Sequence, residues 1–351
     1  MKSLALATLL ALAPSFLQAP ALAQAPAAPP AQLALNDLVN RPDRLPPAVT
    51  LKRAFDFGGG QSARAGQSVK VLEFNGSEVL VDAGNDLLFG VAPGDCDLVE
   101  AANKAWAALT PAQRAVDVAA VLADSSLWPE KVTCYSAFEL NSGAVLPGGT
   151  EYDFLTADAN GVRLFATKEG AALTADLSQT DLIARARQRA LVEPEKRAAR
   201  LPAALKGALV DIEGKPLTGD AYASAKVFVL YYGASWCPPC RKFSPTLVDF
   251  ANKSRADNPG LAFVLMSNDQ DPKDMLGYMK DEKMPWPALP LEKLKKSPLF
   301  MGYTGQYIPL LVVVDRYGKV LASSVDAGGN YTGTAAPFQE LTKLVQSGAA
   351  K

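Results

Sequence analysis

The sequence contains no histidine among its 351 residues. This absence excludes serine–histidine and cysteine–histidine nucleophile pairs, histidine-ligated zinc or haem, and acid–base chemistry by an imidazole. Any proton transfer must therefore use a carboxylate, a lysine, a tyrosine, a cysteine or water.

An excess of charge of either sign is also missing. The chain has 35 Lys and Arg residues against 36 Asp and Glu residues, a formal net charge of −1. A nucleic-acid-binding protein needs a basic surface that displaces phosphate counterions, and a polybasic membrane-surface protein needs a similar excess. We therefore expect neither kind of partner. Apolar residues still make up 49% of the chain, which is enough for more than one buried core.

A long apolar run occurs only at the start of the chain. Lys2 precedes an Ala- and Leu-rich stretch at residues 4–17, and a small-x-small cleavage site ends at Ala23. This pattern predicts a secretory signal peptide at residues 1–23. The alternative is an uncleaved membrane anchor, but the run contains Pro14 and is shorter than the about 20 apolar residues that a spanning helix needs.

The rest of the sequence contains no stretch that is apolar enough to cross a bilayer. We therefore expect a mature chain without an integral membrane span, secreted into an oxidising space, most simply a bacterial periplasm. Residues 24–47 are rich in Ala and Pro and predict a linker rather than a packed core.

An internal repeat follows the linker. A shift of 83 positions aligns Val49-Thr50 with Val132-Thr133 and Ala54-Phe55 with Ala137-Phe138, and after one inserted residue Asp97-Leu98 aligns with Asp181-Leu182. In each copy, apolar and polar residues alternate on both sides of a turn signal, at Asn75-Gly76 and at Asp158 to Gly161. We predict two repeats at residues 48–110 and 131–180, joined by a helical connection at 111–130.

Helices are expected at the end of each repeat and between the repeats. The expected ranges are Asp97 to Leu109, Pro111 to Leu122 with Thr110 as its N-cap, and Asp181 to Leu191. By pattern and length the two units resemble SH3-like barrels, so we expect small β-barrel-like repeats. Barrels of this kind would suit a peptide or a cell-wall fragment, but we prefer the simpler alternative of a spacer or dimerisation module.

Two of the four cysteines flank the helical connection. Cys96 closes the first repeat and Cys134 opens the second. In an oxidising compartment such a pair predicts a structural disulfide, which would stabilise the fold by roughly 3–4 kcal/mol in the chain-entropy model. The alternative is two buried free thiols.

The segment at residues 181–200 contains several arginines and few acidic residues. We interpret it as a solvated connecting helix that breaks near Pro194, with a partner-binding helix as the alternative.

From residue 201 to residue 351 the pattern changes to strands that alternate with helices. The continuous apolar run Val227 to Tyr232 is typical of a strand that is buried on both faces, and Leu261 to Met266 and Leu310 to Asp315 have the same character. Such alternation predicts an α/β sheet covered by helices on both faces.

One motif in this region carries chemistry. Trp236-Cys237-Pro238-Pro239-Cys240 follows the first buried strand and opens a helix, and Ile308-Pro309 precedes a later strand. These residues resemble the thioredoxin superfamily. The longer segments Tyr231 to Phe243 and Met284 to Pro290 are most similar to tryparedoxins and nucleoredoxins. The resemblance implies a thioredoxin fold, a cis Pro309 against the sulfurs, an Ile308 backbone that faces the substrate, and a Trp236 that shields the disulfide.

The position of the first cysteine agrees with this resemblance on physical grounds. A helix N-terminus carries partial positive charge and free N–H groups, which lower the pKa of a cysteine thiol below its usual value of about 8.5. Cys237 is therefore the expected nucleophile, and Cys240, one turn later, is the expected resolving thiol. Pro238 and Pro239 fix φ and make the turn rigid.

The sequence departs from the thioredoxin pattern in two places. Tyr231 stands where many thioredoxins have a buried Asp that relays protons, and Leu310 follows the proline where Thr is common. Deprotonation of the resolving thiol must then use water or another group, and the fine substrate preference is open.

Other uses of a C-x-x-C motif fit less well. Zinc would need four ligands and would have to recruit the distant Cys96 and Cys134, while a c-type haem needs a His where this chain has Arg241. A purely structural disulfide would not need Trp236. We expect no cofactor and no metal.

These observations predict a secreted thiol–disulfide oxidoreductase, in preference a reductase, that acts through Cys237 and Cys240. The expected partners are protein or peptide disulfides and an upstream dithiol electron donor. The alternative hypothesis is a cell-envelope adaptor whose barrel-like units bind an envelope ligand and whose redox domain serves as a docking fold.

Overall fold

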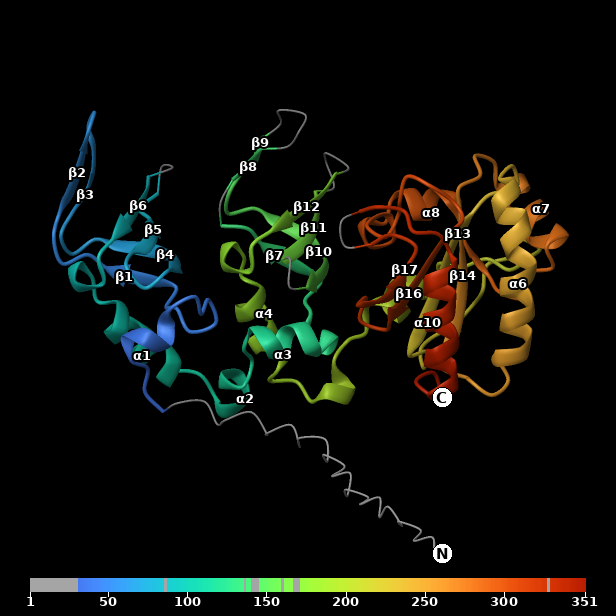
Figure 1. The fold of residues 1–351 in the computed structure, drawn as a ribbon, viewed down its shortest axis with the longest axis horizontal. Helices are drawn as coiled ribbons and strands as arrows, with labels where there is room; N and C mark the ends of the chain where they lie inside the picture. Colours follow the sequence, from blue (N-terminus) through green and yellow to red (C-terminus); the bar gives the residue numbers. More distant parts are fainter. Residues whose placement is uncertain are drawn as a thin grey trace, which may run out of the picture.

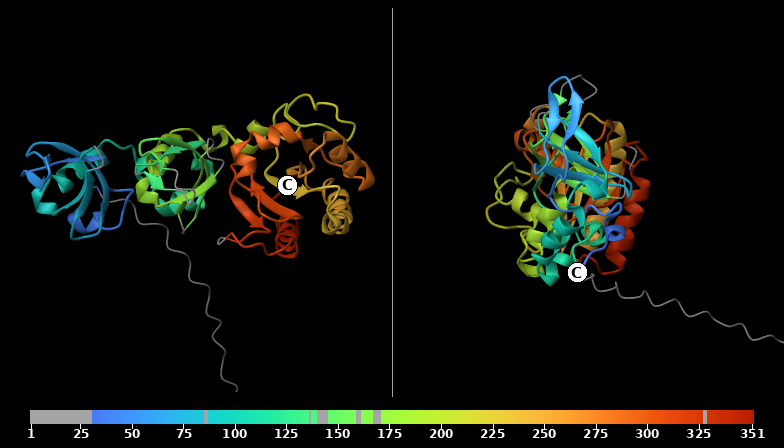
Figure 2. Two further views of the ribbon diagram at one scale, coloured as in Figure 1. Left: turned by 90° about the horizontal axis from the view of Figure 1, so that it is seen from above. Right: turned by 90° about the vertical axis from the view of Figure 1, so that its left-hand side faces the viewer.

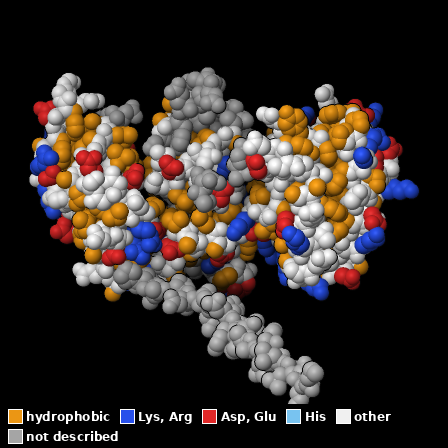
Figure 3. Space-filling model, in the orientation of Figure 1, with side chains coloured by type: hydrophobic (Ala, Val, Ile, Leu, Met, Phe, Trp, Pro, Cys, Tyr) orange, Lys and Arg blue, Asp and Glu red, His pale blue; other side chains and the backbone are white. Residues whose placement is uncertain are grey.

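The computed structural model describes residues 31–84, 87–135, 137–139, 145–158, 161–166, 171–326 and 329–351. The predicted signal peptide and the first part of the predicted linker lie outside these residues. Three modules follow one another in chain order along the long axis of the molecule (Figure 1 and Figure 2). On the face drawn in Figure 3, acidic and basic side chains are interspersed over all three modules.

The first module is an open four-stranded antiparallel sheet in the order β1-β4-β5-β6. Its strands are β1 (Ala48–Thr50), β4 (Ser68–Phe74), β5 (Val79–Asp82) and β6 (Leu88–Val91). A separate hairpin of β2 (Phe55–Gly58) and β3 (Gln61–Ala63) projects from the sheet. The helix α1 (Leu98–Ala107) comes after β6 in the chain. Alternate residues of β4 are buried, as expected for a sheet that covers one core.

The second module repeats this architecture in the order β7-β10-β11-β12. Its strands are β7 (Lys131–Thr133), β10 (Glu151–Asp158), β11 (Gly161–Ala166) and β12 (Ala171–Ala175), with a hairpin of β8 (Phe138–Glu139) and β9 (Val145–Leu146). The helix that follows, α4 (Leu182–Arg189), corresponds to α1.

The repeat extends to the register of the strands. Val49 is paired with Val69 in the first module, and Val132 is paired with Tyr152, 83 residues later for each partner, in the second. Both modules also have a register shift at the same place, before Glu73 and before Thr156. The shift of 83 positions found in the sequence therefore describes a real structural repeat.

An aspartate at the start of the final helix closes each repeat. Asp97 accepts a hydrogen bond from the backbone N–H of Thr50 at 2.6 Å, and Asp181 accepts the equivalent bond from Thr133 at 2.7 Å. Within the described residues both sheets are open, and neither closes into a barrel.

The expected disulfide between Cys96 and Cys134 is wrong in this structure, because both thiols are free and buried. Cys96 forms an isolated bridge with Leu51 in the first module, and Cys134 forms the equivalent bridge with Thr180 in the second. In the alignment of the repeats, Cys134 therefore corresponds to Leu51 and Cys96 corresponds to Thr180. The two cysteines occupy different positions of the repeat and lie in different modules. Each packs into the core of its own module.

The helices in the connection between the repeats are shorter than expected. Thr110 caps the helix with a hydrogen bond from Gln113, as predicted, but α2 (Pro111–Arg114) ends after four residues. Asp117 then caps a second helix, α3 (Val118–Ala123). Asp117 competes for backbone N–H groups, so one continuous helix over 111–122 was the wrong expectation.

The segment after α4 is also not a solvated helix. It breaks as predicted, into η5 (Pro194–Lys196) and α5 (Arg200–Leu205), but its arginines bind backbone carbonyls. The buried guanidinium of Arg200 donates to the carbonyls of Phe154 and Leu155 in β10. Arg200 therefore attaches the second module to the third.

The third module is a five-stranded sheet in the order β15-β14-β13-β16-β17, with β13 and β14 parallel and β16 antiparallel to β13. Its strands are β13 (Val227–Gly233), β14 (Leu261–Ser267), β15 (Ala288–Leu289), β16 (Leu310–Asp315) and β17 (Val320–Ser323). Its helices after α5 are α6 (Pro238–Ser254), α7 (Pro272–Asp281), α8 (Leu291–Lys295), α9 (Pro298–Met301) and α10 (Ala335–Gln346).

Both faces of this sheet are covered, as the continuous apolar strands predict. Val229 and Tyr231 of β13 pack with residues of α6, α7 and α10, whereas Phe228 and Leu230 pack with residues of α5, α8 and α9. The strands at the centre of the sheet thus separate two cores. Among the described residues, no helix combines the length and the apolar character needed to span a bilayer.

The number of free thiols tests the correction for Cys96 and Cys134. In the double variant Cys237→Ser/Cys240→Ser, denatured without reductant, we expect two reactive thiols per chain because both remaining cysteines are free. A disulfide between them would instead give no reactive thiol. Titration with a thiol-specific chromogenic reagent distinguishes the two results.

Candidate active site

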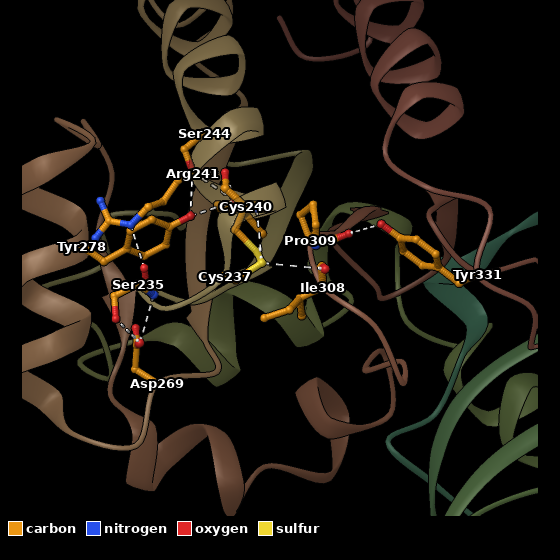
Figure 4. The surroundings of a disulfide bond; sticks show 11 residues. Ser235, Cys237, Cys240, Arg241, Ser244, Asp269, Tyr278, Ile308, Pro309 and Tyr331 are labelled. Atoms are coloured by element: carbon orange, nitrogen blue, oxygen red, sulfur yellow. Dashed lines mark hydrogen bonds between the residues drawn. A yellow bond between two sulfur atoms is a disulfide. The ribbon is translucent and has the colours of Figure 1, made fainter.

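A disulfide between Cys237 and Cys240 lies at the start of α6, with the two Cα atoms 5.2 Å apart (Figure 4). Cys237 is the N-cap of this helix, and its Sγ accepts a hydrogen bond from the backbone N–H of Cys240 at 3.2 Å. Pro238 and Pro239 occupy the first helical positions, where a missing N–H costs nothing. The helix start therefore directs a free N–H and its partial positive charge at the first sulfur.

The two sulfurs differ less in exposure than the motif suggests. Cys240 is fully buried and Cys237 is 3% exposed. The segment before β16 covers Cys237, because the carbonyl oxygen of Ile308 lies 3.8 Å from its Sγ. The adjacent Trp236 is 64% exposed and borders the disulfide on the surface.

The Ile308–Pro309 segment lies against the disulfide, as the resemblance implies, and its peptide bond is cis. Tyr331 fixes this segment from the other side, because its hydroxyl donates to the carbonyl of Pro309 at 2.8 Å (Figure 4). The rings of Tyr331 and Tyr307 are 5.7 Å apart, and Tyr307 is 59% exposed. The sequence did not identify these two tyrosines as parts of the site.

Asp269 is a further residue of the site that the sequence did not identify. Its buried carboxylate accepts hydrogen bonds from the backbone N–H of Ser235 at 2.9 Å and from the Ser235 hydroxyl at 2.7 Å. It also accepts one from the hydroxyl of Ser267 at 2.8 Å. Ser235 and Asp269 each follow a buried strand by two residues, and these strands are parallel neighbours, so the sequence did contain a signal for this pair.

Arg241 ties the same loop to the helix. Its Nε donates to the carbonyl of Ser235 at 2.7 Å, and its guanidinium lies 3.5 Å from carboxylates of Asp281 and Glu282. The loop that carries Trp236 is therefore held by a carboxylate on one side and by a guanidinium on the other.

Tyr231, which replaces the expected aspartate, belongs to a buried cluster of hydroxyl groups. Its hydroxyl lies 3.1 Å from that of Ser244 and 3.0 Å from that of Tyr278, and Ser244 donates to the carbonyl of Cys240 at 3.0 Å. Burial raises the pKa of both tyrosines, so they stay protonated at neutral pH. The cluster therefore orients the first turn of α6, and it provides no ionised base for Cys240.

The structure brings together Cys237, Cys240, Ile308 and Pro309 (Figure 4), and it places Cys96 and Cys134 in the other modules. Trp236 precedes Cys237 in the chain and is exposed. In the part of the chain that the structure describes, no cluster of three or more cysteine, aspartate or glutamate side chains could hold a metal ion. The chemistry of this site is that of two sulfurs within bonding distance.

Comparisons with known proteins agree with this geometry. A family model described as thioredoxin-like matches residues 225–320. The tryparedoxin of Trypanosoma brucei brucei is 37% identical over 91 residues, which cover 26% of this chain and 61% of that protein. Mouse nucleoredoxin is 30% identical over 118 residues, which cover 33% of this chain and 26% of that protein.

Among solved structures, a tryparedoxin from Trypanosoma brucei matches with 32% sequence identity over 35% of this chain and 85% of that chain, at a TM-score of 0.30. Of the two curated relatives named above, the chain spans 61% of the length of the tryparedoxin and 26% of the length of the nucleoredoxin.

The role of Asp269 is testable by its removal. Asp269→Ala leaves the N–H and hydroxyl of Ser235 without their acceptor, so we expect the free energy of unfolding to fall by about 2 kcal/mol. Asp249→Ala is the control, since this exposed carboxylate makes only a surface ion pair with Lys253. Urea denaturation of both variants checks the difference, and equal stability would show that Asp269 does not hold the loop.

Proposed function

Since the C-terminal part of this chain is a thioredoxin-like domain, we propose that the protein is a thiol–disulfide oxidoreductase that acts through Cys237 and Cys240. The observation that carries the proposal is the bonded sulfur pair at the N-terminus of α6, placed against the Ile308–Pro309 segment. A merely structural disulfide would not need a helix N-terminus or an exposed tryptophan beside it.

The proposed reaction uses the reduced pair. The Cys237 thiolate attacks a substrate disulfide, forms a mixed disulfide and releases one substrate sulfur as a thiolate, which takes up a proton. The Cys240 thiolate then attacks the Cys237 sulfur, the Cys237–Cys240 bond forms, and the second substrate thiol leaves. The substrate gains two electrons and the pair loses two. An upstream dithiol donor returns the pair to its reduced state.

The order of the two cysteines follows from their surroundings. The backbone N–H of Cys240 points at the Cys237 sulfur, so a negative charge is stabilised there. Cys240 is fully buried and can be reached only by the neighbouring sulfur. Cys237 is therefore the nucleophile and Cys240 the resolving thiol.

The proposed substrates are disulfides in proteins or peptides. The backbone of Ile308 borders Cys237, and the exposed rings of Trp236, Tyr307 and Tyr331 surround the site. Exposed aromatic groups bury a large apolar area on contact, as a polypeptide partner requires. We favour the reductive direction, on the similarity to tryparedoxins.

We place the mature protein outside the cytoplasm, most simply in a bacterial periplasm, on the basis of the apolar start of the sequence. The chain recovered from the envelope fraction of the native host should then begin at or near Gln24. N-terminal sequencing checks this, and an intact N-terminus on a cytoplasmic protein would contradict it.

The two N-terminal units act in this proposal as SH3-like spacers that position the redox domain. Three polar contacts join the third module to the second unit and to the connection before it, and they support a fixed arrangement: Arg200 with β10, Lys319 with the carbonyls that end α3, and Ser125 with Asp315. The competing function is an envelope adaptor, in which the redox domain only docks.

Cysteine variants separate enzyme from adaptor. We expect Cys237→Ser to abolish the acceleration of insulin reduction by dithiothreitol, because no nucleophile remains, and Cys240→Ser to accumulate the mixed disulfide in the absence of dithiothreitol, because nothing resolves it. Turbidity follows the first effect and non-reducing electrophoresis the second. Full biological function in Cys237→Ser would favour the adaptor and contradict the enzyme.

The reduction potential of the pair tests the direction. A reductase requires a potential close to that of thioredoxin, about −270 mV, whereas a potential near −120 mV is typical of a strong oxidant. Equilibration with glutathione buffers, followed by alkylation and mass measurement, gives the value. A strongly oxidising result would overturn the reductive direction and leave the exchange reaction in place.

A further inference from the structure

A cleft of about 280 Å³ lies between the two N-terminal repeats, far along the chain from the disulfide. Its walls come from the segment before β1, from β4 and α1 of the first repeat, and from η4 (Leu177–Gln179) and α4 of the second. Its volume lies at the lower end of the range for small-molecule sites, which suits a compact ligand.

Two cations face this cleft without an ion-pair partner. Among the described residues, no carboxylate lies within ion-pair distance of Lys70 or Arg187, and the Arg187 guanidinium instead donates to the backbone carbonyls of Gln113 and Asp43. The ammonium of Lys70 lies 3.4 Å from the centre of the Tyr135 ring, and the guanidinium of Arg187 lies 5.6 Å from the centre of the Trp106 ring. Burial lowers the pKa of both groups, and the nearest aspartates offset this only in part.

The carboxylates in the same cleft are already neutralised. Asp43 is 1% exposed and accepts two hydrogen bonds of 2.8 Å from Arg41. Asp181 binds the backbone of Thr133 and pairs with Arg185 at 2.8 Å. The cleft therefore has an excess of positive charge, together with an apolar and aromatic wall.

The repeat shows that the fold does not require these cations. In the strand register, Lys70 corresponds to Asp153 of the second repeat, which has the opposite charge at the same position. Arg187 corresponds to Asn103, which binds the backbone of Leu33 and Val99 within its own module. Lys70 thus belongs to this cleft and not to the architecture that the repeats share, whereas Arg187 lines the cleft and also ties α4 to the backbone of Asp43 and Gln113.

We propose that the cleft between the repeats binds a small organic carboxylate, whose negative group pairs with Lys70 and Arg187 and whose apolar part packs on the Trp106 side. The carboxylate supplies the anion that the two cations lack, and the buried position strengthens the pairing. Leu72 and Ile183 complete the apolar wall. This site is separate from the redox chemistry and stands without it.

The probe is hippurate, which carries one carboxylate and one aromatic ring. In calorimetric titrations of the mature chain we expect one hippurate per chain. The variant Lys70→Gln should bind it about tenfold more weakly, a loss of about 1.4 kcal/mol. Lys52→Gln removes an exposed lysine of the same module outside the cleft, and it should bind hippurate like the parent protein.

An NMR measurement locates the binding. The indole N–H signal of Trp106 should shift on addition of hippurate, while that of Trp236 at the disulfide should not. Lys70→Arg keeps the charge and should bind hippurate more tightly than Lys70→Gln does. This variant separates loss of the cation from damage to the fold.

Several results would overturn the proposal. One is binding of hippuramide, which has the same shape without the charge, with the affinity of hippurate. Another is binding of inorganic phosphate, which has no ring, with the affinity of hippurate. Equal affinity of the Lys70→Gln variant and the parent protein would also contradict it, as would the absence of hippurate binding in the millimolar range. The redox assays above are unaffected by any of these outcomes.

Discussion

The proposed chemistry of this protein depends on one arrangement, in which the first turn of α6 presents a backbone N–H to the sulfur of Cys237. Everything around it keeps that turn in place. Pro238 and Pro239 restrict the backbone, and Asp269 and Arg241 hold the loop before it. Below the turn, the hydroxyl cluster at Tyr231 binds the carbonyl of Cys240. Removal of the helix N-terminus would leave two ordinary thiols in a buried pocket.

The sequence predicted those parts of the site that are local in the chain. The strand, the C-x-x-C turn and the helix follow one another, so periodicity and proline placement were sufficient. Asp269 and Tyr331 were missed because they reach the site from 34 residues after Ser235 and 22 residues after Pro309. Contacts of that kind depend on which strands become neighbours. For Asp269 the only signal was its place two residues after a buried strand, which matches the place of Ser235.

The N-terminal half shows a different limit. The repeat was visible in the sequence and is confirmed down to the paired residues of β1 and β7. The expected disulfide between Cys96 and Cys134 is wrong because closeness to one connection in the sequence does not bring two cysteines together in space. The alignment of the repeats places Cys96 opposite Leu51 and Cys134 opposite Thr180, in separate cores. The arginines of the segment after α4 are bonded to backbone carbonyls and not solvated as expected. Amino-acid composition cannot show such partners.

A single strand connects the second repeat to the redox site. β16 begins at Leu310, directly after the proline that lies against Cys237, and ends at Asp315, which binds Ser125 in the connection that precedes the second repeat. Lys319, in the turn that follows, binds the carbonyls at the end of α3. Six residues therefore join the contact between the modules to the segment that covers Cys237. Gly302 packs so closely on Leu155 that a side chain there would collide with it. The N-terminal part is thus held against the third module at both places, and these contacts support the proposed spacer role.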